Sequence, residues 1–310
     1  FDNITTDIEE ALHEAELIFV VVAAFLQEEI ARTCAPFVHD RQTIILTPGN
    51  FGGSIQFSTE LQRAGCNTLP KIGETECMMY ACRKKDPTTI WIRGYKHHLG
   101  FAAFPAKDTD AMLTTIQPIY PTYVPRKHVL ETGLSNPNPF VHVPLMLFNL
   151  SNIENAVDIL MYHTAFTESV GSIVAALEAE RLSLNAVEGL KLLPMTKIVQ
   201  GYYAYQGARG ETLCELHRSN PIFSWTYLPK TLQHRYFRED IPYGLVPLYS
   251  CAKRFGTPHS AIQALIDLSC VATQTNYYEN ARDLRRLGLG TYSAAQLLRF
   301  VVDGLPGSQK

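Results

Sequence analysis

The sequence predicts two domains of different class, a partial doubly wound α/β domain followed by an all-α domain. At 310 residues the chain exceeds the size at which a single core usually stops growing. Its first third alternates β-branched runs with helical patterns, whereas the part after His142 is helical in pattern. The Asn/Pro-rich stretch 135–139 separates the two, so we expect domains at 1–135 and 136–310.

The elements of the first domain begin with the run 17–22, a continuous apolar stretch typical of a strand buried on both faces of a parallel sheet. A helical pattern follows over 25–32, and 43–46 forms a second buried strand. The glycine-rich turn 48–53 ends this series. Strand, helix, strand and turn make half of a doubly wound domain, whose ligands lie beyond the carboxyl ends of the strands. Here that edge includes Ala23 and the turn.

Strand-like patterns continue beyond this half-domain. The stretches 76–83, 88–94 and 99–104 are separated by turn residues, and we expect them to extend the sheet. The segment 124–134 is expected to supply the last strand.

The second domain begins with a stripe of apolar residues close to a 3.6 period between 153 and 193. We interpret this stripe as core packing or a dimer face. The segment 195–230 is rich in Tyr, Gly and Pro and is either surface packing or a cover for a cleft. Two further helices are expected at 241–255 and 260–273.

Composition excludes several classes of protein. A net charge of -3 and a pI near 6.4 argue against nucleic-acid binding. Seven cysteines without a CxxC pair favour reduced thiols, no metal centre and a cytoplasmic location. The longest apolar run, 17–26, is about half of the ~20 residues needed to cross a bilayer.

Two polar clusters carry the candidate chemistry, 136–144 with His142 and 234–244 with Arg235 and Asp240. A histidine supplies a proton near neutral pH, a carboxylate fixes its tautomer, and a guanidinium binds a planar anion. Spacing alone does not bring the clusters together, and Asp267 is a rival partner for the histidine. The alternative is a histidine that only caps or packs at an interdomain turn.

These motifs, taken in order, resemble the octopine/opine dehydrogenases. The resemblance rests on the strand 17–22, the turn 48–53, Glu74-Thr75 followed by Tyr80-Ala81-Cys82-Arg83, the asparagines and prolines around His142, and the segment 239–245. It implies a Rossmann-like domain joined to a helical domain. It also implies NADH- or NADPH-dependent reductive condensation of an amino acid with a 2-oxo acid such as pyruvate.

The resemblance also assigns roles to residues. It implies that His142 and Asp240 are catalytic and that Arg235 binds substrate, with Thr75 and Gln56 as looser matches for substrate binding. The cofactor would lie against the edge formed by Ala23, Pro48, Gly49 and Asn50. Small-molecule substrates are the expected partners, with no membrane, and a homodimer stays open.

The chain departs from the family pattern at its start. It begins at Phe1 and contains no GxGxxG fingerprint, so the first βαβ segment and phosphate loop are expected to precede it. Without them, cofactor binding by this chain is expected to be weak or absent. Ala23-Ala24 also replaces the Pro-Ala that relatives tend to have.

Other functions remain open from sequence alone. One is a 2-hydroxy-acid, glycerol-phosphate or ketopantoate type dehydrogenase, which would need a catalytic lysine such as Lys191 or Lys197. Another is a non-catalytic relative. The amino acid, the 2-oxo acid, the choice between NADH and NADPH and the oligomeric state are not determined by the sequence.

Overall fold

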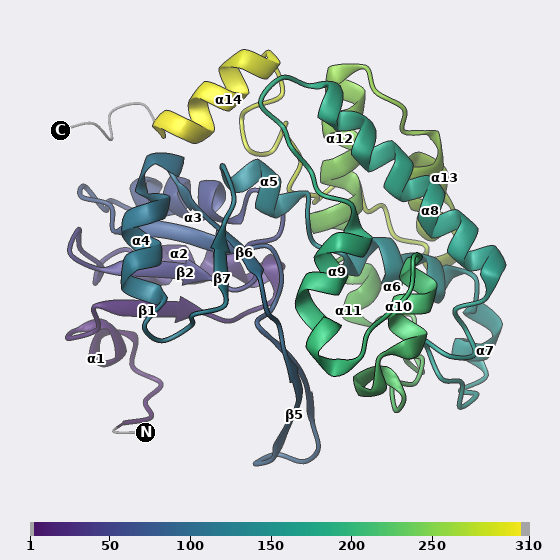
Figure 1. The fold of residues 1–310 in the computed structure, drawn as a ribbon. Helices are drawn as coiled ribbons and strands as arrows, with labels where there is room; N and C mark the ends of the chain where they lie inside the picture. The colour runs from purple at the N-terminus through teal and green to yellow at the C-terminus, as the bar shows by residue number, and fades with distance from the viewer. Residues whose placement is uncertain (1–2, 305–310) are drawn as a thin grey trace. The chain divides into compact units, whose positions relative to one another are not determined.

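The computed structural model describes residues 3–304, which divide into two compact units (Figure 1). The sheet unit contains, of the described residues, 3–77, 100–133 and 292–304, and the helical unit contains 78–99 and 134–291. These units differ from the expected division at residue 135 in two segments. Residues 78–99 group with the helices, and the C-terminal residues from 292 group with the sheet.

The sheet unit is built on a five-stranded sheet with the order β1-β2-β3-β6-β7. Its strands are β1 (Leu17–Val20), β2 (Thr43–Leu46), β3 (Lys71–Thr75), β6 (Leu99–Phe104) and β7 (Tyr123–Pro125). The first three are parallel, and β6 runs antiparallel to β3. All of β2 is buried, as its β-branched run predicts. The expected strand–helix–strand arrangement is therefore confirmed.

Helices pack around this sheet. They are α1 (Ile8–Leu12), η1 (Ala24–Leu26), α2 (Gln27–Cys34), α3 (Gly53–Arg63), η2 (Ala106–Asp108), α4 (Thr109–Ile116), α5 (Val129–Gly133) and α14 (Ala294–Asp303). The core between sheet and helices includes Ile44, Leu46, Phe57 and Leu61. Phe300 of α14 contacts Phe104 at the end of β6, with ring centroids 5.3 Å apart. This contact explains why the C-terminal helix groups with the sheet.

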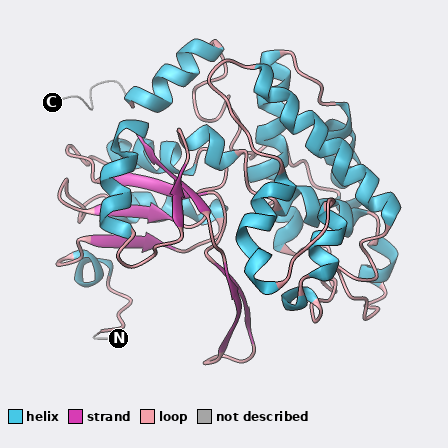
Figure 2. Cartoon of the chain, viewed as in Figure 1, coloured by secondary structure: helices cyan, strands magenta, loops and turns pink. Residues whose placement is uncertain are grey.

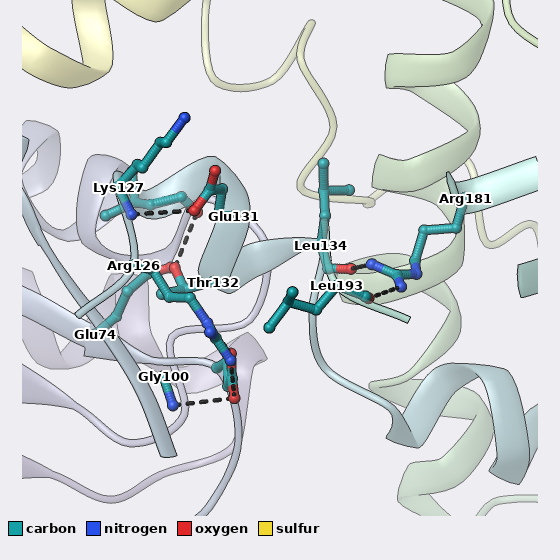
Figure 3. Close-up of polar contacts among 11 residues, drawn as sticks. Glu74, Gly100, Arg126, Lys127, Glu131, Thr132, Leu134, Arg181 and Leu193 are labelled. Carbon is teal, nitrogen blue, oxygen red and sulfur yellow. Dashed lines mark hydrogen bonds and ion pairs between the residues drawn. The ribbon is translucent and has the colours of Figure 1, made fainter. Parts of the chain in front are cut away.

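Buried carboxylates hold the centre of the sheet unit (Figure 3). Glu74 accepts hydrogen bonds from the backbone N–H and hydroxyl of Ser54 and from the hydroxyl of Thr132. Glu76 forms a bidentate ion pair with Arg126, at 2.8 and 3.0 Å. The bonds of Glu74 join the end of β3 to α3 and α5. Both carboxylates have the partners that a buried charge requires.

The helical unit is made mainly of helices (Figure 2). They are α6 (Asn138–Leu147), α7 (Leu150–Glu154), α8 (Glu168–Ser183), η3 (Leu184–Ala186), α9 (Met195–Tyr203), η4 (Ala204–Gln206), α10 (Leu213–Ser219), η5 (Pro221–Phe223), α11 (Arg235–Arg238), η6 (Ile241–Leu245, π-helical), α12 (Val246–Phe255) and α13 (Ser260–Thr273). The two helices expected over 241–255 and 260–273 are confirmed, the first with a π-helical opening turn.

Helix α8 packs against α6, α10, α12 and α13. Val170, Val174 and Leu177 are buried on its inner face, so this part of the apolar stripe forms core. Arg181 is fully buried and donates to the carbonyls of Leu134 and Leu193 (Figure 3). A buried guanidinium therefore joins the start of the unit to the loop before α9.

The prediction that residues 76–104 extend the sheet is only partly correct. β6 joins the sheet, but β4 (Tyr80–Lys84) and β5 (Ile90–Tyr95) pair with each other as a separate antiparallel hairpin (Figure 2). The hairpin carries the charged run Arg83-Lys84-Lys85 and is largely exposed, whereas all six residues of β6 are buried. Adjacent residues of a strand point to opposite faces, so this run puts a charge on each face of the hairpin. Charged residues are almost never fully buried, so such a strand is disfavoured inside a buried sheet.

The last expected strand is also shorter than predicted. Only Tyr123–Pro125 is a strand, and Val129–Gly133 forms α5. The hydrogen bond from Thr132 to Glu74 and the close packing of Gly133 on Phe51 favour the helix. None of the helices described in residues 3–304 is long and apolar enough to cross a membrane. All seven cysteines are free thiols.

Candidate active site

A buried histidine–aspartate pair lies at the centre of the helical unit. Nδ1 of His142, on α6, is 2.7 Å from Oδ2 of Asp240, the residue before η6. Both side chains are about 7% exposed. The structure therefore brings together the two polar clusters that lie 98 residues apart in the sequence.

Local sequence explains how this approach is possible. The side chain of Asn136 accepts a hydrogen bond from the N–H of Asn138 and so helps to start α6. Gly244 of η6 packs directly on the ring of Pro139, where any Cβ would clash. The glycine in Ile-Pro-Tyr-Gly thus allows η6 and α6 to approach closely, which places Asp240 beside His142.

Burial and charge shift the protonation of this pair. Burial lowers the pKa of His142 well below its ordinary value, and nearby Arg235 and Arg83 add to this effect. Burial raises the pKa of Asp240 to about 7, although Arg235 opposes the shift. Both shifts disfavour charge in a buried place. Near neutral pH the histidine is thus uncharged, and the pair as a whole can take up or release a proton.

Two tyrosines complete the surroundings of His142. The hydroxyl of Tyr162 lies 3.2 Å from Nε2 of His142, and the ring of Tyr236 stacks on the imidazole with centroids 3.8 Å apart. The ring of Tyr162 also stacks on His217 and lies tilted against Phe223. The imidazole is therefore held through both nitrogens and one face.

Arg235 begins α11, next to this cluster. Its Nη1 atom lies 3.1 Å from Oε2 of Glu239, and its side chain is 51% exposed. It influences the pKa of both His142 and Asp240, which places its charge near the pair. The guanidinium keeps donors available for an anion, because one carboxylate oxygen occupies only part of its fork.

The rival carboxylate is engaged elsewhere. Oδ1 of Asp267, on α13, accepts a hydrogen bond of 2.7 Å from the hydroxyl of Tyr278 on the protein surface. Asp240, not Asp267, is the carboxylate in contact with His142.

The two looser candidates lie in the sheet unit. The Thr75 hydroxyl, at the end of β3, donates to the carbonyl of Cys77 and lies 3.1 Å from the Thr47 hydroxyl. Gln56, on α3, donates from Nε2 to Glu28. Both side chains thus have partners within their own unit.

The expected cofactor residues lie at the carboxyl ends of β1 and β2. Ala23 precedes η1, while Pro48, Gly49 and Asn50 follow β2 after a cis Thr47–Pro48 bond. Gln27 donates to the carbonyl of Pro48 and so joins the two segments. Neighbouring parallel strands place these small residues along one edge, where dinucleotides bind in doubly wound sheets.

The N-terminal turn of α3 is already engaged, because the Ser54 N–H is bonded to the buried carboxylate of Glu74. Pro48, Gly49 and Asn50 are themselves buried.

Sequence reasoning missed three residues around the histidine. Tyr236 is adjacent to Arg235 and follows from its position, and Arg83 belongs to the Tyr-Ala-Cys-Arg motif. Tyr162 lies in an irregular segment with no motif around it, so nothing in the sequence indicated its contact with His142.

Comparison with known proteins agrees with this architecture. Residues 125–273 match the family model described as NAD/NADP octopine/nopaline dehydrogenase, alpha-helical domain. An opine dehydrogenase from Arthrobacter sp. (strain 1C) is 32% identical over 294 residues, 95% of this chain and 81% of the relative. A vitopine synthase from Allorhizobium ampelinum is 25% identical, over 97% of this chain and 81% of its own length.

A solved structure has the same fold. Octopine dehydrogenase with NADH and L-arginine matches with a TM-score of 0.75 at 20% identity, covering 97% of this chain and 81% of that one. These matches place the chain among the NAD(P)-dependent oxidoreductases. The chain belongs to the octopine/opine dehydrogenase family. The family uses NAD or NADP and reductively condenses an amino acid with a 2-oxo acid, as the resemblance implied. The expectation that this chain by itself binds the cofactor weakly stays a prediction.

Proposed function

We propose that His142 and Asp240 are the acid–base pair of this condensation. The observation that carries the proposal is their buried hydrogen bond of 2.7 Å. Asp240 accepts a hydrogen bond from the Nδ1–H of His142. This bond fixes the orientation of the ring, and the carboxylate stabilises the imidazolium once it forms. A positioned acid–base group of this kind contributes a factor of about 10²–10⁴ in rate.

The pair serves two proton transfers. When the amine adds to the carbonyl of the 2-oxo acid, His142 takes a proton from the attacking nitrogen. It delivers that proton to the carbonyl oxygen, which gives a carbinolamine. It then moves the second nitrogen proton to the resulting hydroxyl, so the C–O bond breaks, water leaves and an imine remains. Because the histidine is neutral at rest, it begins as the base.

Arg235 is proposed to hold one substrate carboxylate. Both substrates carry such a group, and a guanidinium binds it through two parallel hydrogen bonds. Gln56 and Thr75 are proposed as further polar contacts to substrate.

Ala23, Pro48, Gly49 and Asn50 are proposed to hold the nicotinamide. A bound NADH or NADPH supplies the hydride that reduces the imine carbon.

The free thiols of the chain support a cytoplasmic location.

The function is tested with the complete native polypeptide, by following nicotinamide absorbance with pyruvate alone, an amino-acid mixture alone, and both together. Oxidation that requires both supports imine reduction. Oxidation with pyruvate alone would instead make the chain a hydroxy-acid dehydrogenase.

A further inference from the structure

The β4–β5 hairpin is part of the helical unit, although its sequence lies between two strands of the sheet. Arg93 of β5 donates to the carbonyl of Ile222 and the hydroxyl of Thr226. The hydroxyl of Tyr205 bonds both the N–H and the carbonyl of Tyr95. Contacts to two separate loops therefore fix the hairpin against the helices.

One side chain of the hairpin reaches the ring that stacks on the histidine. The hairpin is irregular nearby, because Arg93 of β5 is the extra residue between Gly94 and Ile92, which pair with Ala81 and Cys82. Such β-bulges are frequent beside active sites. Nη2 of Arg83 lies 3.3 Å from the hydroxyl of Tyr236, whose ring stacks on His142.

Arg83 differs from Arg235 in having no ionic partner among residues 3–304. Arg235 is paired with Glu239, whereas Arg83 donates to the carbonyl of Cys82 and to the hydroxyl of Tyr236. Within residues 3–304, no carboxylate lies within ion-pair distance of Arg83, and its residue is exposed. The positive charge of Arg83 is nevertheless close enough to the His142–Asp240 pair to help lower the pKa of His142.

The reaction needs more anion binding than Arg235 supplies. The amino acid and the 2-oxo acid each bring a carboxylate, and both remain in the product on either side of the new secondary amine. Two carboxylates bound close together repel each other unless each has its own cation.

We propose that Arg83 binds the second substrate carboxylate, so that Arg83 and Arg235 together recognise the dicarboxylate amine that the reaction makes. This inference rests on the proposed function of the His142 cluster and deepens it. It assigns the hairpin a direct part in substrate recognition, with Tyr236 between the two guanidinium groups.

The test uses iminodiacetate, the smallest secondary amine with two carboxylates, and N-methylglycine, which has one. Their affinities are measured by titration calorimetry on the chain in the presence of NAD⁺. We expect Arg83→Gln to weaken iminodiacetate binding by about 10- to 100-fold, the value of one charge-assisted contact, with little effect on N-methylglycine. Arg83→Lys keeps the positive charge but not the planar guanidinium, so its affinity for iminodiacetate should lie between those of Arg83→Gln and the unaltered chain.

The matched control is Lys84→Gln, which removes the same charge from the opposite face of the same strand. Equal loss in Lys84→Gln and Arg83→Gln would overturn the proposal in favour of a general field effect. So would unchanged discrimination between the two ligands in Arg83→Gln, or no preference of the unaltered chain for iminodiacetate. The readout here is binding, whereas turnover is followed separately by nicotinamide absorbance. An enzyme inactive in that assay but with normal discrimination here would contradict the proposed function and leave this inference standing.

Discussion

The hydroxyl of Tyr162 lies 3.2 Å from Nε2 of His142, the nitrogen that Asp240 does not contact. With Nδ1–H donated to Asp240, Nε2 carries a lone pair and the phenol donates to it. A phenol can also accept, so Tyr162 stays a partner when the imidazole is protonated. The tyrosine thus accompanies the histidine through both protonation states.

Removing this hydroxyl should shift the pH dependence of the reaction. Because the phenol donates to the neutral imidazole, its loss in Tyr162→Phe raises the pKa of His142. We expect the acidic limb of the kcat/KM profile to move to higher pH and the maximum rate to fall by up to about tenfold. A lower rate with an unchanged profile would indicate that the hydroxyl only supports packing.

His142→Ala should remove turnover but not cofactor affinity. The acid–base contribution lost is about 10²–10⁴ in kcat. The dissociation constant for NADH or NADPH, measured by nicotinamide fluorescence, should be nearly unchanged. Equal loss of both properties, with altered circular dichroism, would point to a folding role.

Two aspartate variants separate the candidate partners of the histidine. Asp240→Asn loses the negative charge that stabilises the imidazolium, so kcat should fall by about 10² or more. Asp267→Asn affects only a surface bond to Tyr278 and should be almost silent. The reverse order of rates would contradict the assignment of Asp240.

The stability of Asp240→Asn should depend on pH more steeply than that of the unaltered chain. The folded-state pKa of His142 is lowered from 6.5, so the unfolded chain binds the extra proton, and stability falls as the pH drops through about 6.5. The raised pKa of Asp240, about 7 against 3.8, has the opposite effect, giving stability that is lost as the pH rises through 7. The two offset each other only while Asp240 is present.

Thermal unfolding at about pH 5 and about pH 7.5 measures this difference. The gap in Tm between Asp240→Asn and the unaltered chain should be larger at the acidic pH. A gap that is constant, or that closes on acidification, would show that the two shifts do not have the inferred signs.

Periodicity was sufficient for much of the fold. The sequence predicted β1 and β2 from their continuous β-branched runs. It predicted α12 and α13 from apolar residues repeating at helical spacing. The hairpin was misplaced because pairing partners are not encoded in local pattern. Its attachment depends on Arg93 and Tyr95 meeting side chains more than a hundred residues away.

The candidate site shows the same limit. His142, Arg235 and Asp240 were found because they occur in recognisable motifs. Tyr162 was not, since its contact is made by a loop that aligns with the segment before α11 through a single bridge between Leu160 and Tyr227. Residues positioned by such long-range pairing leave no trace in one sequence.

The placement of the hairpin has a consequence for recombination between relatives. The chain passes from one unit to the other four times, after residues 77, 99, 133 and 291. A single crossover near residue 135 would exchange the hairpin together with the sheet and separate Arg83 from the helices that fix it. From the proposed role of Arg83, we expect a chimaera to transfer substrate choice only when residues 78–99 move with the helical unit and the final helix stays with the sheet. Specificity would then be modular in three dimensions but not along the gene.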